Sequence, residues 1–551
     1  MGQTVEVRAK VVTGTAITRE DKICYIALGV LLFIVYLIRS NFFEIPFERD
    51  EGAYGYYGKL LLEGKTPYID FYEQKFPGIF YFYALMVGVF GATVKGLHVG
   101  FMLLNMATIV VLYFAGRKLF NPIAGLIGAI TFAIVSMTPN LSGFTVQSEH
   151  GVAFFISLGI LLYARTLEKK SWISYFLMGL AMGAAIMVKT SGVFLVLWGG
   201  LALVVDFIFS EKRTFPEFLK RVVSYSVAVF AVVGILFLVM AVKGSFDQMM
   251  YWSFEIPKRY VSRIKWEDGK QYLDYTYKAI TTDYKFFWMH AAAMLISVFV
   301  KGIRWPLKLV MILLLALSVL TVFPGFYFYG HYWIQILPGL SIAAAFTCYT
   351  LLTLLKSGLK VDQRKIRYGY LGVFTIIMLV HLNKKKDYYF NPNYDRILRT
   401  VYGNNPFPET KRIADYINAN STRDDQIVSI GSEPQIYFYT GKNCPSRHAY
   451  FSAIVDQVEE HHQWQREFVE DVSKANPRYI VFYNHPISLM VQPDTDKFVW
   501  EWYDKYIQNY HMVGCVEMID GYMNSNYYWH EQLNNFKPQS QMLIYIYERN
   551  S

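Results

Sequence analysis

A charged cluster follows the first apolar segment of the chain. Arg49-Asp50-Glu51-Gly52 stands before an aromatic, helix-like run that reaches Glu63. Two adjacent carboxylates at this place are not needed to anchor a hydrophobic segment. A carboxylate here can act as a general base that removes the proton of a hydroxyl group. The pattern equally suits a helix N-cap, in which an Asp side chain accepts from free backbone N–H groups. Both roles stay open on the pattern alone.

Two lysines stand where apolar segments begin or end. Lys75 precedes a Pro-Gly turn in the run Tyr72–Gly78, where an ammonium can serve as a point charge for a phosphate. It can equally be an interfacial lysine at the start of a helix. Lys189 lies between two apolar runs, and a charge at the edge of the hydrocarbon is expensive and usually functional.

An acid and a histidine mark two further apolar runs. Glu149 opens one of them, and a carboxylate this near the hydrocarbon is usually functional. Its alternative role is a favourable interaction with the N-terminus of its own helix. His331 and Tyr332 open the other run. A lone histidine at such a place is more often a hydrogen-bonded structural residue than a ligand.

The elements that must position these residues are membrane helices. The chain has 551 residues, of which 54% are hydrophobic and only 17% are charged, whereas soluble proteins carry about a quarter charged residues. The apolar residues gather in runs such as 25–38, 191–209 and 222–242. Runs of about twenty apolar residues match the hydrocarbon thickness of a bilayer. The chain is therefore expected to cross a membrane many times.

The net charge of +10 does not indicate nucleic-acid binding, because no basic stripe with interleaved aromatics lies in a polar segment. Lys and Arg instead cluster in short connectors between apolar runs, which is the positive-inside pattern. The polar, basic segment 1–22 lacks a cleavable signal and is expected to be cytoplasmic. Four cysteines exclude a disulfide-dense scaffold and a Cys-rich metal site.

The charge rule gives one consistent topology. The run 79–92 is short for a crossing, and we interpret it as a re-entrant or interfacial helix. Counting it as a crossing would place five later basic clusters on the outer side, against the charge rule. About eleven crossings remain, at 23–40, 96–116, 122–139, 150–166, 172–188, 192–210, 222–243, 285–301, 306–323, 332–355 and 367–383.

Most of the polar chemistry then faces outward. The first external loop covers 41–95. A second loop, 244–284, mixes aromatic residues with cations such as Arg259 and suits lipid phosphates; a solvated loop with snorkelling lysines is the alternative. The membrane domain is expected to span 23–383 and to precede a soluble domain at 384–551.

Alternating helical and short apolar runs give this terminal domain an α/β character with a partly parallel sheet. The expected helices are 409–420 and about 454–474, and the expected strands lie near 426–431, 478–483, 511–518 and 542–548. Cys444 and Cys515 both fall in this domain. A disulfide between them and two free thiols are equally compatible with the sequence.

The run FERDEGAYGYYGKLLLEGKTPYIDFYEQKFPG resembles the first external loop of the GT-C glycosyltransferases. It is most similar to family 39-like protein mannosyltransferases and lipid A aminoarabinose transferases. The resemblance implies that Asp50 is the catalytic carboxylate and Glu51 its companion. Lys75-Phe76-Pro77 corresponds to a Lys-Pro-Pro-like motif that contacts carrier phosphate, with a departure at Phe76. Glu149 corresponds to a second acid, and Lys189 to a lysine-bearing turn.

The resemblance covers most of 23–210, less of 324–340, and hardly any of the terminal domain. It implies a polytopic α-helical membrane protein with the GT-C fold and a C-terminal extracytoplasmic α/β domain. The expected catalytic residues are Asp50, Glu51 and Glu149. The expected substrate and phosphate contacts are Arg49, Lys75, Lys189, Arg259, His331 and Tyr332.

The implied activity is inverting transfer of a sugar from a polyprenyl-phosphate donor to a hydroxyl of a lipid, glycan or protein acceptor. We expect a multi-pass protein of the bacterial inner membrane, with the site on the outer face and no cofactor. A divalent metal between Asp50 and Glu149 stays open as an alternative. The competing hypotheses are an oligosaccharide ligase or transferase with a larger lipid-linked donor, a lipid or glycan transporter, and a non-catalytic scaffold. A transporter is disfavoured because the ionisable residues cluster at one face and no repeat is visible.

Overall fold

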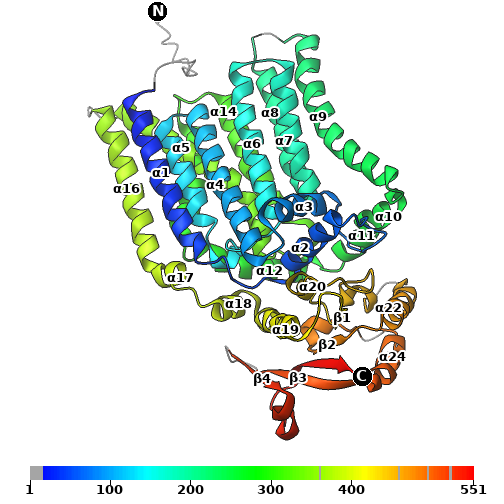
Figure 1. Cartoon of the computed structure of the whole chain (residues 1–551). Helices are drawn as coiled ribbons and strands as arrows, with labels where there is room; N and C mark the ends of the chain where they lie inside the picture. The colour runs from blue at the N-terminus through cyan, green and yellow to red at the C-terminus, as the bar shows by residue number, and fades with distance from the viewer. Residues whose placement is uncertain are drawn as a thin grey trace, which may run out of the picture.

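The chain folds into a helical bundle with a smaller α/β layer at one end (Figure 1). The computed structural model describes residues 17–211, 213–358, 362–456, 459–492, 495–519 and 524–550. Residues 1–16 of the predicted cytoplasmic segment and Lys212 of one predicted basic cluster lie outside the described residues.

Among the described residues, seven helical segments are long and apolar enough to cross a membrane. They are α1 (Arg19–Ser40), α4 (Val94–Leu119), α6 (Glu149–Glu168), the segment Thr190–Ile208 with α8 (Val193–Ile208), α9 (Phe215–Val242), the segment Gly330–Lys356 with most of α15 (Leu337–Gly358), and α16 (Gln363–Lys384). Five shorter apolar helices accompany them: α3 (Gly78–Phe90), α5 (Pro122–Val135), α7 (Trp172–Val188), α13 with η4 (Lys285–Phe299) and α14 (Trp305–Leu320). Each predicted crossing overlaps one of these helices, and the chain is a multi-pass membrane protein. The number of eleven crossings stays a prediction.

The core of the bundle lies around α5 and α15. Residues Ile123–Val135 of α5 are all buried, and 83% of the apolar window of α15 is buried. By contrast, only 28% of the corresponding window of α9 is buried, so most of that helix faces outward from the bundle. A central helix that is apolar all round and a peripheral one that is apolar toward the lipid are both typical of membrane bundles.

Basic residues that the charge rule placed in the cytoplasm gather at one end of the bundle. Arg117 at the end of α4 pairs with Asp21 at 2.7 Å, and Arg367 of α16 pairs with Glu20 at 2.9 Å. Lys118 also forms an ion pair with Glu168 at the end of α6. These contacts bring three predicted inner connectors to the start of α1. The α/β layer lies at the opposite end (Figure 1).

The helix α3 is shorter than the hydrocarbon thickness of a bilayer. It has 13 residues, which at 1.5 Å per residue is about 20 Å against a hydrocarbon thickness of about 30 Å. With α2 (Arg49–Leu62) it lies at the end of the bundle that faces the α/β layer (Figure 1). This placement agrees with its interpretation as a re-entrant or interfacial helix.

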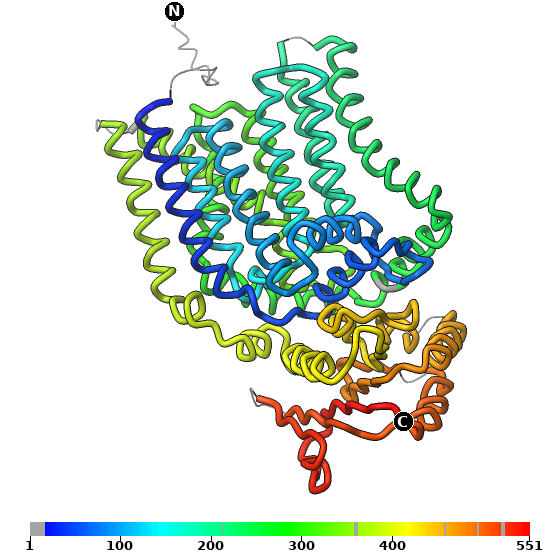
Figure 2. Tube along the Cα trace, viewed as in Figure 1, coloured from blue at the N-terminus to red at the C-terminus, as the bar shows by residue number. Residues whose placement is uncertain are grey.

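The second external loop is largely helical. After α9 the chain forms α10 (Phe246–Met250), a π-helical turn η3 (Tyr251–Glu255), α11 (Ile256–Val261) and α12 (Trp266–Thr281). In Figure 2 the first external loop, in blue, meets this loop and the orange part of the C-terminal domain at one end of the bundle. Three segments far apart in the sequence therefore enclose a common region.

The C-terminal domain contains a sheet of five strands in the order β1-β2-β5-β3-β4. The strands are β1 (Ile427–Ile430), β2 (Tyr479–Asn484), β3 (Tyr510–Met518), β4 (Ser525–Trp529) and β5 (Met542–Arg549). The pair β1–β2 is parallel and the others are antiparallel, which confirms the predicted mixed sheet. Its helices are α17 (Lys386–Phe390), α18 (Tyr394–Tyr402), α19 (Phe407–Asn420), α20 (Gln435–Thr440), α21 (Phe451–Ile454), α22 (His461–Ala475), α23 (Pro486–Leu489) and α24 (Phe498–Tyr506).

Three details of this domain differ from the sequence prediction or complete it. The long polar helix begins at His461, seven residues later than expected from 454. The edge strand β4 was not predicted, because its residues Ser525–Trp529 are polar and aromatic and only half-buried. Cys444 and Cys515 are both free thiols, so the disulfide alternative is not formed.

Candidate active site

The helix α2 places Asp50 next to the α/β layer. Its N-terminus is closed by a capping box, in which Glu48 accepts from the Glu51 N–H at 2.9 Å and Glu51 accepts from the Glu48 N–H at 2.8 Å. Gly52 and Gly58 allow close packing on both sides: a Cβ would meet Gln435 of α20 at one and the Tyr83 backbone of α3 at the other. The glycines of the sequence Gly-x-x-Gly-x-x-Gly therefore let α2 pack closely between the membrane bundle and the C-terminal domain.

Asp50 is half-buried and accepts hydrogen bonds on both oxygens. The Tyr54 hydroxyl donates to Oδ2 at 3.2 Å, and the Tyr450 hydroxyl donates to Oδ1 at 2.8 Å. Burial raises the pKa of the carboxyl, but Lys75, the Tyr450 hydrogen bond and His331 outweigh it and hold the pKa below its usual value. Asp50 is therefore an ionised carboxylate near neutral pH, as a general base must be.

Glu51 has a different environment from its neighbour. Besides capping α2, its carboxyl accepts from the backbone N–H of Val146, and only 1% of the residue is exposed. Burial raises its pKa to about 8. Glu48 likewise accepts from the Gln147 amide at 2.6 Å. The two glutamates tie α2 to the segment before Glu149, and Asp50 is the residue of the adjacent pair whose pKa is lowered.

Lys75 is brought to Asp50 by the turn Pro77-Gly78. A Cβ on Gly78 would meet the backbone of Met187 at 2.3 Å, so this glycine allows the turn to touch the end of α7 just before Lys189. The backbone carbonyl of Lys75 accepts from the hydroxyls of Tyr68 at 2.6 Å and Ser253 at 3.1 Å. One residue from each external loop thus fixes the backbone of Lys75.

The Lys75 ammonium has no ion-pair partner within 4 Å among the residues that the structure describes. Burial lowers its pKa, but the charges of Asp50, Glu73 and Glu149 outweigh it and raise the pKa above the usual value. The lysine is thus a full positive charge, near several acids but bound by none. Such a cation is free to take an anionic ligand.

Glu149 and Lys189 form the second half of the site. Glu149 is fully buried at the start of α6 and pairs with the Lys189 ammonium. The His331 Nε2 atom lies 3.8 Å from Glu149, and the Lys189 Nζ atom lies 3.9 Å from the ring centre of Tyr332. The Ser191 hydroxyl donates to Gln335 at 2.7 Å and so joins the turn after α7 to the 3-10 turn that precedes α15. All four predicted residues of this half meet.

Arg49 and Arg259 do not join this cluster. The Arg49 guanidinium donates to Glu433 at 2.7 Å and to the Ser432 carbonyl, both in the C-terminal domain. Arg259 forms a bidentate ion pair with Glu460 at 2.7 and 3.1 Å. Both cations are already compensated by acids of the C-terminal domain, which argues against their predicted contact with a phosphate and for a role in docking that domain.

Sequence reasoning missed two tyrosines and one acid. Tyr54 stands four residues after Asp50, a spacing that places both on one face of a helix and that could have indicated the contact. Tyr450 lies 400 positions from Asp50, and nothing in the sequence indicates that pairing. Glu73 is buried, its Oε2 atom has no hydrogen-bond partner, and burial raises its pKa to about 7.

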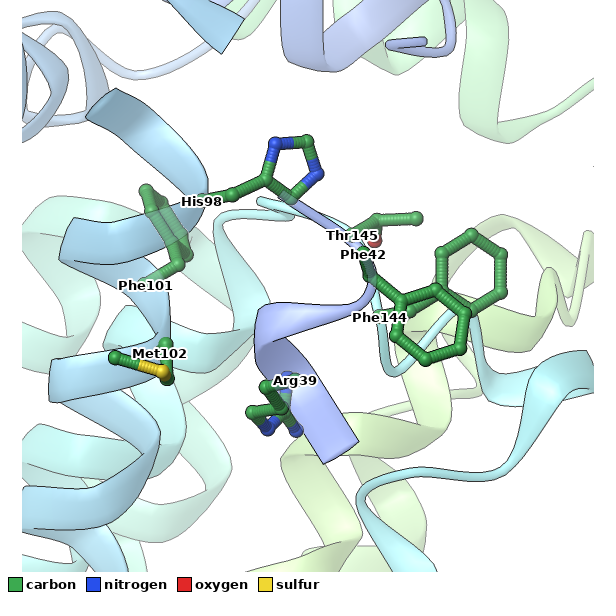
Figure 3. Close-up of a pocket in the computed structure, with 7 residues that line it drawn as sticks. All are labelled: Arg39, Phe42, His98, Phe101, Met102, Phe144 and Thr145. Carbon is green, nitrogen blue, oxygen red and sulfur yellow. The ribbon is translucent and has the colours of Figure 1, made fainter. Parts of the chain in front are cut away.

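None of the predicted site residues lines a small cavity shown in Figure 3. It has room for about one water molecule and is lined by Arg39, Phe42, His98, Phe101, Met102, Phe144 and Thr145. Arg39 and His98 lie at opposite ends of it in Figure 3. The Arg39 guanidinium donates to the Gly143 carbonyl at 2.8 Å and the Ser136 carbonyl at 3.2 Å, so this buried cation stabilises the chain between α5 and α6.

A metal site is not evident in the parts of the chain that the structure describes, where no three His, Cys, Asp or Glu side chains gather closely enough to hold an ion. The alternative of a metal between Asp50 and Glu149 stays a prediction. In the structure these two acids have different partners: Asp50 accepts hydrogen bonds from tyrosines, and Glu149 pairs with Lys189.

Comparisons with known proteins agree with this architecture. Residues 74–242 match the family model for dolichyl-phosphate-mannose-protein mannosyltransferases. No curated protein sequence gives a significant match.

Two solved structures share the fold. ArnT from Cupriavidus metallidurans bound to undecaprenyl phosphate is 14% identical, with a TM-score of 0.55 over 83% of this chain and 93% of that one. The archaeal oligosaccharyltransferase AglB from Archaeoglobus fulgidus, in complex with an inhibitory peptide and a dolichol-phosphate, is 12% identical, with a TM-score of 0.51 over 93% of this chain and 75% of that one. The chain thus has the fold of the GT-C superfamily of integral membrane glycosyltransferases, as its first external loop predicts.

Proposed function

We propose that the chain transfers a sugar from a polyprenyl-phosphate carrier to a hydroxyl group, with inversion at the anomeric carbon. The observation that carries this proposal is the convergence of Asp50, Lys75 and the Glu149–Lys189 pair at one end of the bundle. An ionised base beside an unpaired cation is what attack on a phosphate-activated carbon requires. The base receives the proton of the nucleophile, and the cation stabilises the departing phosphate.

The reaction is a single displacement. Asp50 takes the proton of the acceptor hydroxyl, whose oxygen forms a bond to the anomeric carbon as the bond between that carbon and the phosphate oxygen breaks. The electron pair of the broken bond goes to the phosphate, which leaves on the side opposite to the attack. General-base assistance of this kind contributes about 10²- to 10⁴-fold in rate.

The phosphate lies against Lys75 in this scheme. Lys75 has no acid within ion-pair distance among the described residues, whereas Lys189 is already paired with Glu149. Lys189 then acts as a second, weaker contact, with His331 and Tyr332 completing the wall around it. Fixed cations aimed at the developing charge usually contribute more to the rate of such reactions than any other group.

The solved structures support the donor class of this proposal. ArnT holds undecaprenyl phosphate and AglB holds a dolichol-phosphate in their structures, which supports a polyprenyl-phosphate donor. The acceptor is a hydroxyl of a lipid, a glycan or a protein. The proposed displacement needs no cofactor. The gathering of basic residues at the other end of the bundle supports a site on the non-cytoplasmic face. We place the protein in a bacterial inner membrane.

An assay in lipid nanodiscs tests the proposal. Purified protein is incubated with a panel of undecaprenyl-phosphate and dolichyl-phosphate sugars and a mixture of envelope acceptors, and release of the free carrier phosphate is measured. We expect turnover with one class of donor, and its loss in Asp50→Asn but not in Glu63→Gln, an exposed acid at the other end of α2. Turnover with no donor, or full activity of Asp50→Asn, would contradict the proposal.

Transfer of a preassembled oligosaccharide is the second candidate. It is favoured by the likeness to AglB, which extends over 93% of this chain and so includes most of the C-terminal domain. Donors with a single sugar and donors with a longer glycan on a polyprenyl carrier separate the two reactions. We expect preference for the single sugar, and the opposite preference would select the second candidate.

A further inference from the structure

The C-terminal domain contacts the N-terminal end of α2, which also carries the candidate base. Arg49, the residue before Asp50, is held by Glu433 and by the carbonyl of Ser432. The Tyr439 hydroxyl accepts from the backbone N–H of Phe47 at 2.6 Å. These contacts come from the segment that follows β1, so the domain is docked on the first turn of α2 and its cap.

Tyr450 reaches Asp50 from this docked domain. It directly precedes α21, and its neighbours Ala449 and Phe451 are 2% and 1% exposed. The backbone N–H of Ser452 donates to the Ser432 hydroxyl at 2.8 Å, which ties this loop to the segment that holds Arg49. The Tyr450 side chain is therefore anchored on both sides, and its hydroxyl is directed at Asp50 by the same contacts that dock the domain.

The two tyrosines at Asp50 donate to different oxygens of its carboxylate. Tyr54 donates to Oδ2 from within α2, and Tyr450 donates to Oδ1 from the C-terminal domain at the shorter distance of 2.8 Å. One hydrogen bond to each oxygen fixes the plane of the carboxylate. Each oxygen keeps a second lone pair, which leaves the base able to accept a proton from a hydroxyl.

The contact is not explained by docking alone. Arg49 with Glu433, Phe47 with Tyr439 and the tight approach of Gly52 to Gln435 already join the two domains. A hydroxyl aimed at an ionised carboxylate adds a charge-assisted hydrogen bond where the reacting group lies. We propose that Tyr450 is a positioning residue that the C-terminal domain contributes to the active site, where it orients Asp50. This inference rests on the proposed function of Asp50 as the base, and it makes the C-terminal domain a part of the catalytic centre.

The pH dependence separates this role from a structural one. The hydrogen bond favours the ionised form of Asp50, so its removal raises the pKa of that carboxyl. Because the ionised form is the active base, the acidic limb of kcat/KM moves to higher pH. Tyr450→Phe keeps the ring and removes only the hydroxyl, so the docked domain and the thermal unfolding midpoint are expected to stay unchanged.

The experiment compares Tyr450→Phe with wild type and with Tyr416→Phe, whose hydroxyl contacts His530 on the exposed side of the C-terminal domain. With a donor that wild type accepts, we expect kcat of Tyr450→Phe to fall about 10-fold, KM to change less than about 2-fold, and the acidic limb to move upward. Tyr416→Phe is expected to behave as wild type. A pH profile of Tyr450→Phe that coincides with wild type, or a loss seen only in KM, overturns the inference and leaves the proposed function standing.

A second readout does not depend on turnover. The difference infrared spectrum of wild type minus Asp50→Asn isolates the carboxylate stretch of Asp50 as the pH is changed. We expect the Asp50 titration to move to higher pH in Tyr450→Phe. If wild type turns over no donor, the proposed function fails, and this titration still decides whether the Tyr450 hydroxyl acts on Asp50. An unchanged titration overturns the inference by itself.

Discussion

Lys189 and Glu149 form an ion pair in which the two partners differ in exposure. The Glu149 side chain is 1% exposed, whereas the Lys189 side chain is 25% exposed. The acid is fully desolvated at the start of α6, and the lysine keeps one side open beside Tyr332. A buried acid therefore depends on the lysine for compensation, while the lysine retains room for a further anionic contact.

This asymmetry predicts a separation of stability from activity. Lys189→Met leaves the Glu149 charge buried without a partner, so we expect a loss of about 3 kcal/mol in the free energy of unfolding together with a loss of activity. In the double variant Lys189→Met/Glu149→Gln the buried charge is gone, so the thermal midpoint should largely recover while activity does not. Thermal unfolding and turnover in the same nanodiscs measure both. Recovery of activity in the double variant would show that the lysine acts only on Glu149.

Asp50→Asn is expected to lower kcat by about 10²- to 10⁴-fold. The amide keeps the shape of the side chain and its contacts with the two tyrosines, but it cannot take the proton of the acceptor hydroxyl. Binding of undecaprenyl phosphate should change by less than about 3-fold, because the phosphate lies against Lys75 in the proposed scheme. Single-turnover kinetics and a lipid-binding titration separate the two effects. A variant that loses binding and keeps its rate would reverse the assignment.

Lys75→Met is expected to weaken binding of the carrier phosphate. A hydrogen bond to a charged group contributes about 1.5–3 kcal/mol, so the Kd for undecaprenyl phosphate should rise about 10- to 100-fold. Because Lys75 lowers the pKa of Asp50, its removal raises that pKa, and the acidic limb of kcat/KM should also move to higher pH. Lys75→Arg keeps the charge and serves as the matched variant. Equal binding by wild type and Lys75→Met would place the phosphate elsewhere.

Arg259→Ala is expected to have little effect on carrier binding. Arg259 pairs with Glu460 on the surface, where its side chain is 43% exposed, and exposed ion pairs contribute about 0–1 kcal/mol. The Kd for undecaprenyl phosphate should change by less than about 2-fold, in contrast to Lys75→Met. Titrating Arg259→Ala and Lys75→Met with undecaprenyl phosphate measures this difference in Kd. An effect of Arg259→Ala as large as that of Lys75→Met would restore Arg259 to the phosphate site.

The sequence predicts the membrane architecture well because its signals are local. Apolar runs give the positions of the helices, and the basic clusters give their common end, as the pairs Arg117–Asp21 and Arg367–Glu20 bear out. The strands β1, β2, β3 and β5 follow from short apolar runs in the same way. The edge strand β4 lacks such a run, and only its pairing with β3 makes it a strand.

The site was predictable only in part, since the type of a charged residue does not show which side chain it pairs with in the fold. The first loop indicated Asp50 and Lys75, which stay in the site with each other's charge as a neighbour. Arg49 stands beside Asp50 in sequence, yet its side chain points to Glu433 in another domain. Tyr450 is the converse case, because its contact with Asp50 spans 400 positions and depends on how the C-terminal domain docks.

Glu51 predicts a stability effect of its own. Its carboxyl accepts from the backbone N–H groups of Glu48 and Val146, both buried. Glu51→Ala leaves these donors without a partner, and each is expected to cost about 1–3 kcal/mol of unfolding free energy. Glu63→Gln, at the exposed end of the same helix, is the control and should change the thermal midpoint little. A midpoint for Glu51→Ala equal to that of wild type would show that water replaces the lost acceptor.

The pH dependence of this effect has a definite sign. Burial raises the pKa of Glu51 in the folded protein to about 8, above its ordinary value of 4.5. The folded state therefore binds this proton more tightly than the unfolded state, and its contribution to stability is complete below pH 4.5 and is lost as the pH rises to about 8. In Glu51→Gln the group no longer titrates, so the fall in thermal midpoint between these pH values should be smaller than in wild type. Parallel pH–midpoint curves for the two proteins would mean that Glu51 is ionised in the fold and that the neighbouring Asp50 shares its site with a second negative charge.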